Sequence, residues 1–185
     1  SGPCGCGKTT LTNAYAEHLV KTEKRTKIYV IHGDDFHHGF AGMYEEDAFC
    51  AEEQDSNPLA WEQVLKFNWE CILDVAGKAL KRGLDVVIDY VVEDELPLLQ
   101  MLAKEQNARL YYVVLTASEE SITKRLKTRG DDELIERAHF LKKKLDNGKF
   151  KFPEPFDNGL ILRDMLEDEV VEKYYINTQK ANDLI

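Results

Sequence analysis

The chain has 185 residues, of which 43% are hydrophobic, and its 34 acidic side chains outnumber its 24 basic ones, so its formal net charge is −10. These values suit one globular domain and exclude a disordered chain. The acidic balance argues against nucleic acid as a partner, and the apolar runs are far shorter than the roughly 20 residues of a membrane span. We therefore expect a cytoplasmic protein that binds neither nucleic acid nor a membrane.

The chain begins with a phosphate-loop motif. Residues 2–9 match the pattern G-x-x-x-x-G-K-[ST] in full. Glycines allow consecutive backbone N–H groups to turn toward an anion, the lysine reaches the β- and γ-phosphates, and the hydroxyl of Thr9 can bind Mg²⁺. Apolar residues at helical spacing follow over residues 10–20, so a helix N-terminus would point at the phosphates. The predicted ATP-binding residues are Gly2, Pro3, Cys4, Gly5, Cys6, Gly7, Lys8, Thr9 and Thr10.

A hydrophobic strand normally precedes such a loop and lies in the centre of the sheet. The sequence begins at Ser1, directly before the motif. We therefore expect the native protein to carry this first strand ahead of Ser1.

Strand and helix patterns alternate along the rest of the chain. Runs rich in β-branched and apolar residues predict strands at 27–32, 84–92, 109–115 and 172–177. Helical spacing predicts helices at 58–82, 93–107, 118–129 and 131–145, and residues 39–57 read as a loop or mobile lobe. Alternation of this kind predicts an α/β fold with a parallel sheet and helices on both faces.

Acidic residues follow the first readable strand. Asp34 and Asp35 come directly after Gly33, at the sheet edge where ligands of α/β folds bind. A carboxylate here can accept the proton of an alcohol that attacks a γ-phosphate. Asp35 is our preferred base, with Asp34 steering Mg²⁺ or a substrate hydroxyl. His37 is either a substrate contact or an exposed loop residue.

A third carboxylate closes an apolar run within the second readable strand. Val-Val-Ile-Asp places Asp89 after an apolar run, which is the form of a Walker B segment. Such a carboxylate would hold the hydration shell of Mg²⁺ near Thr9, so the predicted metal residues are Thr9, Asp34 and Asp89.

Cations gather in the helices at 118–145. Lys124, Arg125, Arg129 and Arg137 stand out in an acidic chain, and Arg129 and Arg137 are predicted to be catalytic. An arginine can neutralise the charge that develops on a phosphoryl group in transfer. The alternative is a solvated helix whose cations pair with neighbouring glutamates.

Together these motifs resemble the P-loop kinases of small metabolites. That group includes nucleoside monophosphate, shikimate, adenylylsulfate and gluconate kinases and chloramphenicol phosphotransferase. Gly33-Asp34-Asp35-Phe36-His37 is most similar to the substrate segment of gluconate kinases, although His38 stands where those enzymes have proline. The same Asp-Asp-Phe is also similar to the uridine kinase segment.

The resemblance implies a P-loop NTPase fold with five parallel strands in the order 2-3-1-4-5. It also implies one domain over residues 1–185, with a substrate lobe at 36–70 and a helical lid at 129–150. It would place adenine near Arg125 and Thr178.

We expect a Mg·ATP-dependent kinase that phosphorylates a hydroxyl of a gluconate-like or nucleoside-like metabolite and works as a monomer or homodimer. A nucleotide hydrolase or switch is the first alternative, although the guanine motif of GTPases is absent from the sequence. A protein that binds ATP without turnover is the second. The sequence leaves the acceptor open.

Overall fold

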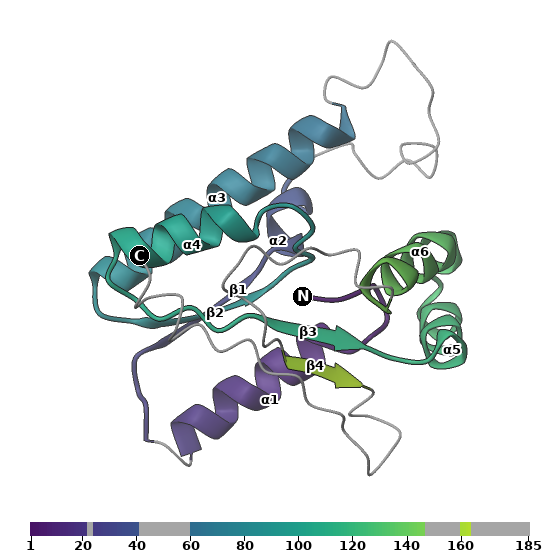
Figure 1. Cartoon of the computed structure of the whole chain (residues 1–185), viewed down its shortest axis with the longest axis horizontal. Helices are drawn as coiled ribbons and strands as arrows, with labels where there is room; N and C mark the ends of the chain where they lie inside the picture. The colour runs from purple at the N-terminus through teal and green to yellow at the C-terminus, as the bar shows by residue number, and fades with distance from the viewer. Residues whose placement is uncertain (22–23, 41–59, 147–159, 164–185) are drawn as a thin grey trace.

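The computed structural model describes residues 1–21, 24–40, 60–146 and 160–163. Their elements, shown in Figure 1, are α1 (Lys8–Lys21), β1 (Ile28–His32), α2 (Asp34–His37), α3 (Trp61–Lys81), β2 (Asp85–Asp89), α4 (Leu96–Glu105), β3 (Val113–Thr116), α5 (Glu119–Arg129), the 3₁₀ turn η1 (Asp132–Leu134), α6 (Ile135–Asp146) and β4 (Leu160–Arg163).

The predicted helices and strands that fall within these residues are present, with ends shifted by up to four residues. Residues 131–145, predicted as one helix, form η1 followed by α6. The strand β4 was not predicted. The expected strand at 172–177, Thr178 and most of the expected loop at 39–57 lie outside the described residues.

The described strands form two parallel pairs. In the first pair Ile28 of β1 is level with Asp85 of β2, and His32 with Asp89. In the second pair β3 lies beside β4. Among the described residues the sheet is therefore seen as two pairs and not as the expected five strands in one order.

Ser1 lies between the two pairs (Figure 1). Its amine donates to the carbonyl oxygen of Val113 at 2.8 Å, and the N–H of Leu115 donates to the Ser1 carbonyl at 2.7 Å, which is the pattern of a parallel ladder. On the other side, the Val92 N–H donates to the Ser1 hydroxyl at 2.9 Å. Val92 lies past the carboxyl end of β2, so the chain enters the phosphate loop at that edge of the sheet.

Helices cover both faces of the β1–β2 pair. Figure 1 shows α3 and α4 on one side and α1 on the other, and both α1 and α3 contact the two strands. The main core packs the buried stripe of α3 and α4 against the strands, through Ile31, Trp69, Ile72, Ala76, Tyr90, Val92, Leu96, Leu99, Tyr112 and Val114. Within the described parts of the chain, no helix is both long and apolar enough to cross a bilayer.

Candidate functional site

The phosphate loop contains three glycines with positive φ, a conformation that other residues rarely adopt. Gly2, Gly5 and Gly7 have φ values of 145°, 76° and 95°, which glycine adopts without strain. A Cβ on Gly2 would lie 2.3 Å from the carbonyl oxygen of Leu115, so the start of the loop lies directly against the backbone of β3. This close approach explains why the loop needs glycine at its first position.

The loop has positive groups in place for an anion. Lys8 Nζ donates to the carbonyl oxygen of Pro3 at 3.1 Å, and Arg125 Nη1 donates to the carbonyl oxygen of Gly5 at 3.2 Å. The first turn of α1 contains no acidic residue, and Thr9 and Thr10 are exposed there. Burial raises the pKa of the Cys6 thiol, so no thiolate opposes a bound phosphate. The triphosphate chain of a nucleotide fits a loop that has two cations beside it and no acidic residue in the helix turn that follows.

Asp89 lies at the carboxyl end of β2 as predicted, and it has a partner that the sequence did not reveal. His32 is level with Asp89 in the strand pairing, and its Nδ1 lies 3.1 Å from Asp89 Oδ2. Asp89 is only 7% exposed. The histidine therefore holds a buried carboxylate in place at the carboxyl end of β2.

Asp34 and Asp35 begin the short helix α2, which starts directly after β1. Both residues are exposed, whereas His37 at the end of the same helix is partly buried. The carboxylates are thus open to a substrate.

Two residues that the sequence analysis missed hold the imidazole of His37. Asn68 Nδ2 lies 3.3 Å from His37 Nδ1 and donates to Tyr90 Oη at 2.9 Å. The Trp61 ring meets the His37 ring edge-on, with centroids 5.7 Å apart. Burial is the main cause that lowers the pKa of His37. The signal in the sequence was an asparagine at the helical spacing of the apolar residues of α3.

The predicted cations separate into two groups. Arg125 contacts the phosphate loop, whereas Arg129 pairs with Asp131 at 2.5 Å. Arg137 pairs with Glu93, and its guanidinium lies over the Phe140 ring at 5.5 Å. In this state the structure places Arg129 and Arg137 on carboxylates.

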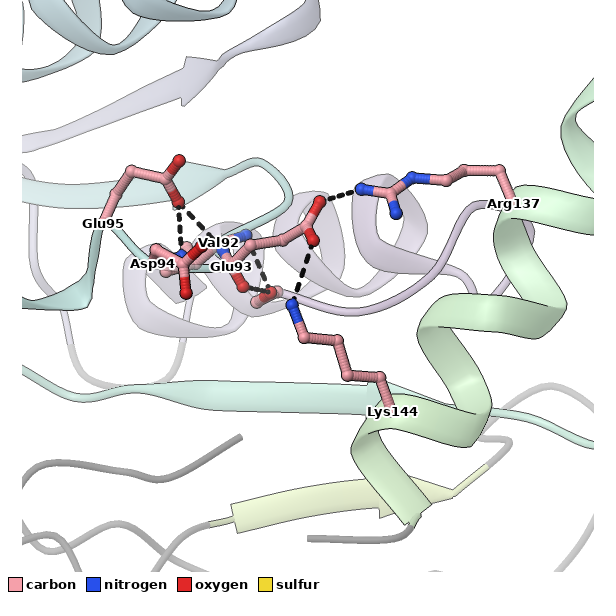
Figure 2. Close-up of polar contacts among 7 residues, drawn as sticks. Val92, Glu93, Asp94, Glu95, Arg137 and Lys144 are labelled. Atoms are coloured by element: carbon pink, nitrogen blue, oxygen red, sulfur yellow. Dashed lines mark hydrogen bonds and ion pairs between the residues drawn. The ribbon is translucent and has the colours of Figure 1, made fainter. Parts of the chain in front are cut away.

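Glu93 receives a second cation from the same helix. Lys144 Nζ lies 3.3 Å from Glu93 Oε2, and Figure 2 shows Arg137 and Lys144 reaching Glu93 from α6. The Glu95 carboxylate accepts hydrogen bonds from the N–H groups of Glu93 and Asp94, which fixes the loop that carries Glu93. The helix α6 is therefore fastened to the segment that follows β2.

The donor set suits a metal that arrives with a nucleotide. Within the described ranges no group of three or more His, Cys, Asp or Glu residues is gathered to hold a metal ion. Magnesium bound to phosphates needs only one or two protein ligands. The exposed hydroxyl of Thr9 and the carboxylate of Asp89 can supply them.

A family model agrees with this geometry. The model AAA_33, described as an AAA domain, matches residues 1–155. The chain belongs to this P-loop kinase-like family. No curated protein is similar enough in sequence to match it.

A solved structure supports the fold. The structure of the Deinococcus radiodurans tunicamycin resistance protein is similar to this chain with a TM-score of 0.50 and 16% identity, over 82% of this chain and 80% of that one. At this identity the likeness concerns the fold alone. The fold is a P-loop NTPase-like α/β fold.

Proposed function

We propose that this protein is an ATP-dependent small-molecule kinase, which transfers the γ-phosphoryl group of Mg·ATP to a hydroxyl of a small metabolite. The observation that carries the proposal is that the exposed carboxylates of Asp34 and Asp35 follow β1 at the sheet edge that also holds the phosphate loop. The γ-phosphate of ATP and the hydroxyl of the acceptor would then meet at one edge of the sheet.

Each residue has a separate task in this mechanism. Lys8 and the loop amides would hold the β- and γ-phosphates, and Thr9 and Asp89 would hold Mg²⁺, which would supply positive charge at the phosphoryl group in transfer. Asp35 accepts the proton of the acceptor hydroxyl, and Asp34 orients that hydroxyl or the metal. His32 keeps the Asp89 carboxylate in place through its contact at 3.1 Å.

The finer architecture is part of the proposal. The order 2-3-1-4-5 counts the expected strand ahead of Ser1 as strand 1, so β2 is strand 3 and β3 is strand 4. Ser1 supports this order, because it bonds β3 on one side and the segment after β2 on the other. The lid at 129–150 would include α6, and Arg137 would have to leave Glu93 to reach a phosphoryl group. The position of Arg125 beside Gly5 suits a role at the nucleotide. Thr178 is proposed there from the family resemblance alone.

The acceptor is proposed to bind between the phosphate loop and the lobe at 36–70, of which 41–59 lie outside the described residues. The partners are therefore ATP, Mg²⁺ and one small molecule carrying a free hydroxyl. A sugar acid or a nucleoside suits the resemblance of residues 33–37. The similar structure of a tunicamycin resistance protein adds tunicamycin to the compounds worth testing.

The experiment that tests this function is ADP release from Mg·ATP in the presence of sugar acids, sugars, nucleosides and antibiotics, tunicamycin included. We expect release that depends on one acceptor class, together with a phosphorylated product seen by mass spectrometry. Release without any acceptor would instead show a hydrolase. ATP binding without release would show a nucleotide-binding protein that performs no transfer.

A further inference from the structure

Asn68 is a polar side chain in the middle of the apolar face of α3, and its exposed fraction is 0%. Burial of an amide is unfavourable unless it forms hydrogen bonds. Its Nδ2 donates to Tyr90 Oη at 2.9 Å and lies 3.3 Å from His37 Nδ1. The amide therefore joins α3 to the residue after β2 and to the helix that carries the acidic pair.

The orientation of this amide follows from what each choice leaves unpaired. With Nδ2 on Tyr90 and His37, only Asn68 Oδ1 is buried without a partner among the described residues. The reverse orientation would bury two N–H donors without partners. Buried N–H groups without partners are rarer in proteins than under-satisfied carbonyl oxygens. The orientation in the structure is the better of the two.

This orientation decides the tautomer of His37. An amide nitrogen can only donate, so His37 Nδ1 must accept, and the proton of the neutral ring is on Nε2. A doubly protonated ring would place two N–H groups face to face. Burial and His38 lower the pKa of His37, whereas Asp34 and Asp35 raise it. Asn68, Tyr90 and Trp61, which meet the ring from α3 and the end of β2, carry no charge at neutral pH.

We propose that Asn68 is a positioning residue that fixes His37 as the Nε2–H tautomer, so that His37 donates a hydrogen bond to an oxygen atom of the acceptor substrate. The substrate part rests on the proposed kinase function, while the tautomer rests on the geometry alone. His37 then is not the base, since its free nitrogen accepts from Asn68. The site selects acceptors that present an oxygen at this point and rejects those that present a protonated amine.

The first test is the tautomer itself, measured by long-range ¹H–¹⁵N correlation NMR on protein labelled at histidine. We expect the His37 signals of an Nε2–H ring. An Nδ1–H ring in the wild-type protein would overturn the proposal, and this result needs no variant to fold.

The second test exchanges the donor for an acceptor. In Asn68→Asp the carboxylate can only accept, so we expect His37 to change to the Nδ1–H tautomer. Tyr90→Phe removes the other partner of Asn68 and serves as the control, in which the Nε2–H tautomer should stay. An unchanged tautomer in a folded Asn68→Asp protein would show that Asn68 does not set it.

The third test is kinetic. Asn68→Leu removes the donor at similar size, and we expect the KM of the acceptor to rise by about three- to tenfold, because one hydrogen bond to substrate is misdirected, with the KM of ATP unchanged. Equal rises in both KM values would indicate a structural role and contradict the proposal. If no acceptor is phosphorylated, the kinase function is refuted, but the tautomer measured by NMR is unaffected. A failure of the proposed function can therefore be told apart from a failure of the proposed role of Asn68.

Discussion

Arg125 Nη1 donates a hydrogen bond to the carbonyl oxygen of Gly5 at 3.2 Å, across 120 positions of sequence. The contact joins α5 to the phosphate loop and brings the positive charge of the guanidinium to the loop. A Cβ on Gly5 would also lie 3.2 Å from both the Ile122 carbonyl oxygen and Leu126 Cγ. Helix α5 is thus packed on the phosphate loop as well as bonded to it, so the two segments support each other.

Lys8→Ala should reduce ATP turnover by about 10²-fold or more, because the charge that holds the β- and γ-phosphates is lost. Lys21→Ala is the matched control, since Lys21 lies at the exposed end of the same helix and pairs with Glu17 at 2.6 Å. Steady-state ADP release measures both variants. Wild-type activity in Lys8→Ala would contradict the assignment of the phosphate loop.

Asp35→Asn should lower kcat by about 10²–10⁴-fold, the usual contribution of a general base, with little change in the KM of ATP. Asp34→Asn is the comparison, because both carboxylates are exposed in the same turn of α2. We expect the Asp34 variant to alter mainly the dependence on Mg²⁺ or the KM of the acceptor. The opposite pattern would exchange the roles of the two residues.

Glu93→Gln should loosen α6, because the neutral amide no longer pairs with Arg137 and Lys144. Partly exposed ion pairs contribute about 0.2–1 kcal/mol each, so loss of both should speed up amide hydrogen exchange over residues 135–146 by roughly 2–30-fold. Asp94→Asn is the control, since Asp94 is the exposed neighbour of Glu93. Unchanged exchange in Glu93→Gln would show that packing alone holds α6.

Gly33→Ala should destabilise the protein by about 1–3 kcal/mol through overpacking. A Cβ at Gly33 would lie 2.4 Å from Tyr90 Cδ2 and 2.9 Å from Ile72 Cδ1, both on buried residues. Gly77→Ala is the contrast, because its Cβ would meet only the end of the Leu102 side chain, at 3.3 Å. Urea unfolding measures both, and a Gly33 variant as stable as wild type would show that Tyr90 can move.

Stability should fall as the pH rises from about 10 to about 12, because burial raises the pKa of Tyr112 from 10.0 to about 12. The unfolded chain ionises this phenol first, so the contribution is complete below the unfolded pKa and is lost as the pH rises through the folded one. Two pKa units correspond to roughly 3 kcal/mol.

The Tyr112 effect is isolated by comparing two phenylalanine variants in urea unfolding at pH 8 and pH 11. Tyr112→Phe should lose less stability between these pH values than the wild type does. Tyr111→Phe, at a neighbouring side chain that is 67% exposed, should behave like the wild type. Equal losses in all three proteins would assign the effect to other groups, such as Tyr90, whose pKa burial also raises.

The sequence by itself determined the parts of this protein that depend on local spacing. The phosphate loop, the helix after it and the polar ends of β1 and β2 follow from glycine conformation, helical period and strand alternation. The helix predicted at 118–129 is present as α5, and the Ser118 side chain caps it by accepting from the Ser121 N–H at 3.1 Å. Asp34 and Asp35 follow β1, and Asp89 ends β2. Because parallel strands share one carboxyl edge, all three lie at the same edge of the sheet.

Only the tertiary structure decided which distant side chains meet. His37 lies on α2, Asn68 on α3 and Tyr90 directly after β2, and their contact depends on which face of α3 packs over the sheet. Arg137, which stays a predicted catalytic residue, pairs here with Glu93, 44 positions away. The partner of Asp89 depended on strand register. Sequence periodicity fixes the faces of an element, whereas packing between elements selects the partners of each face.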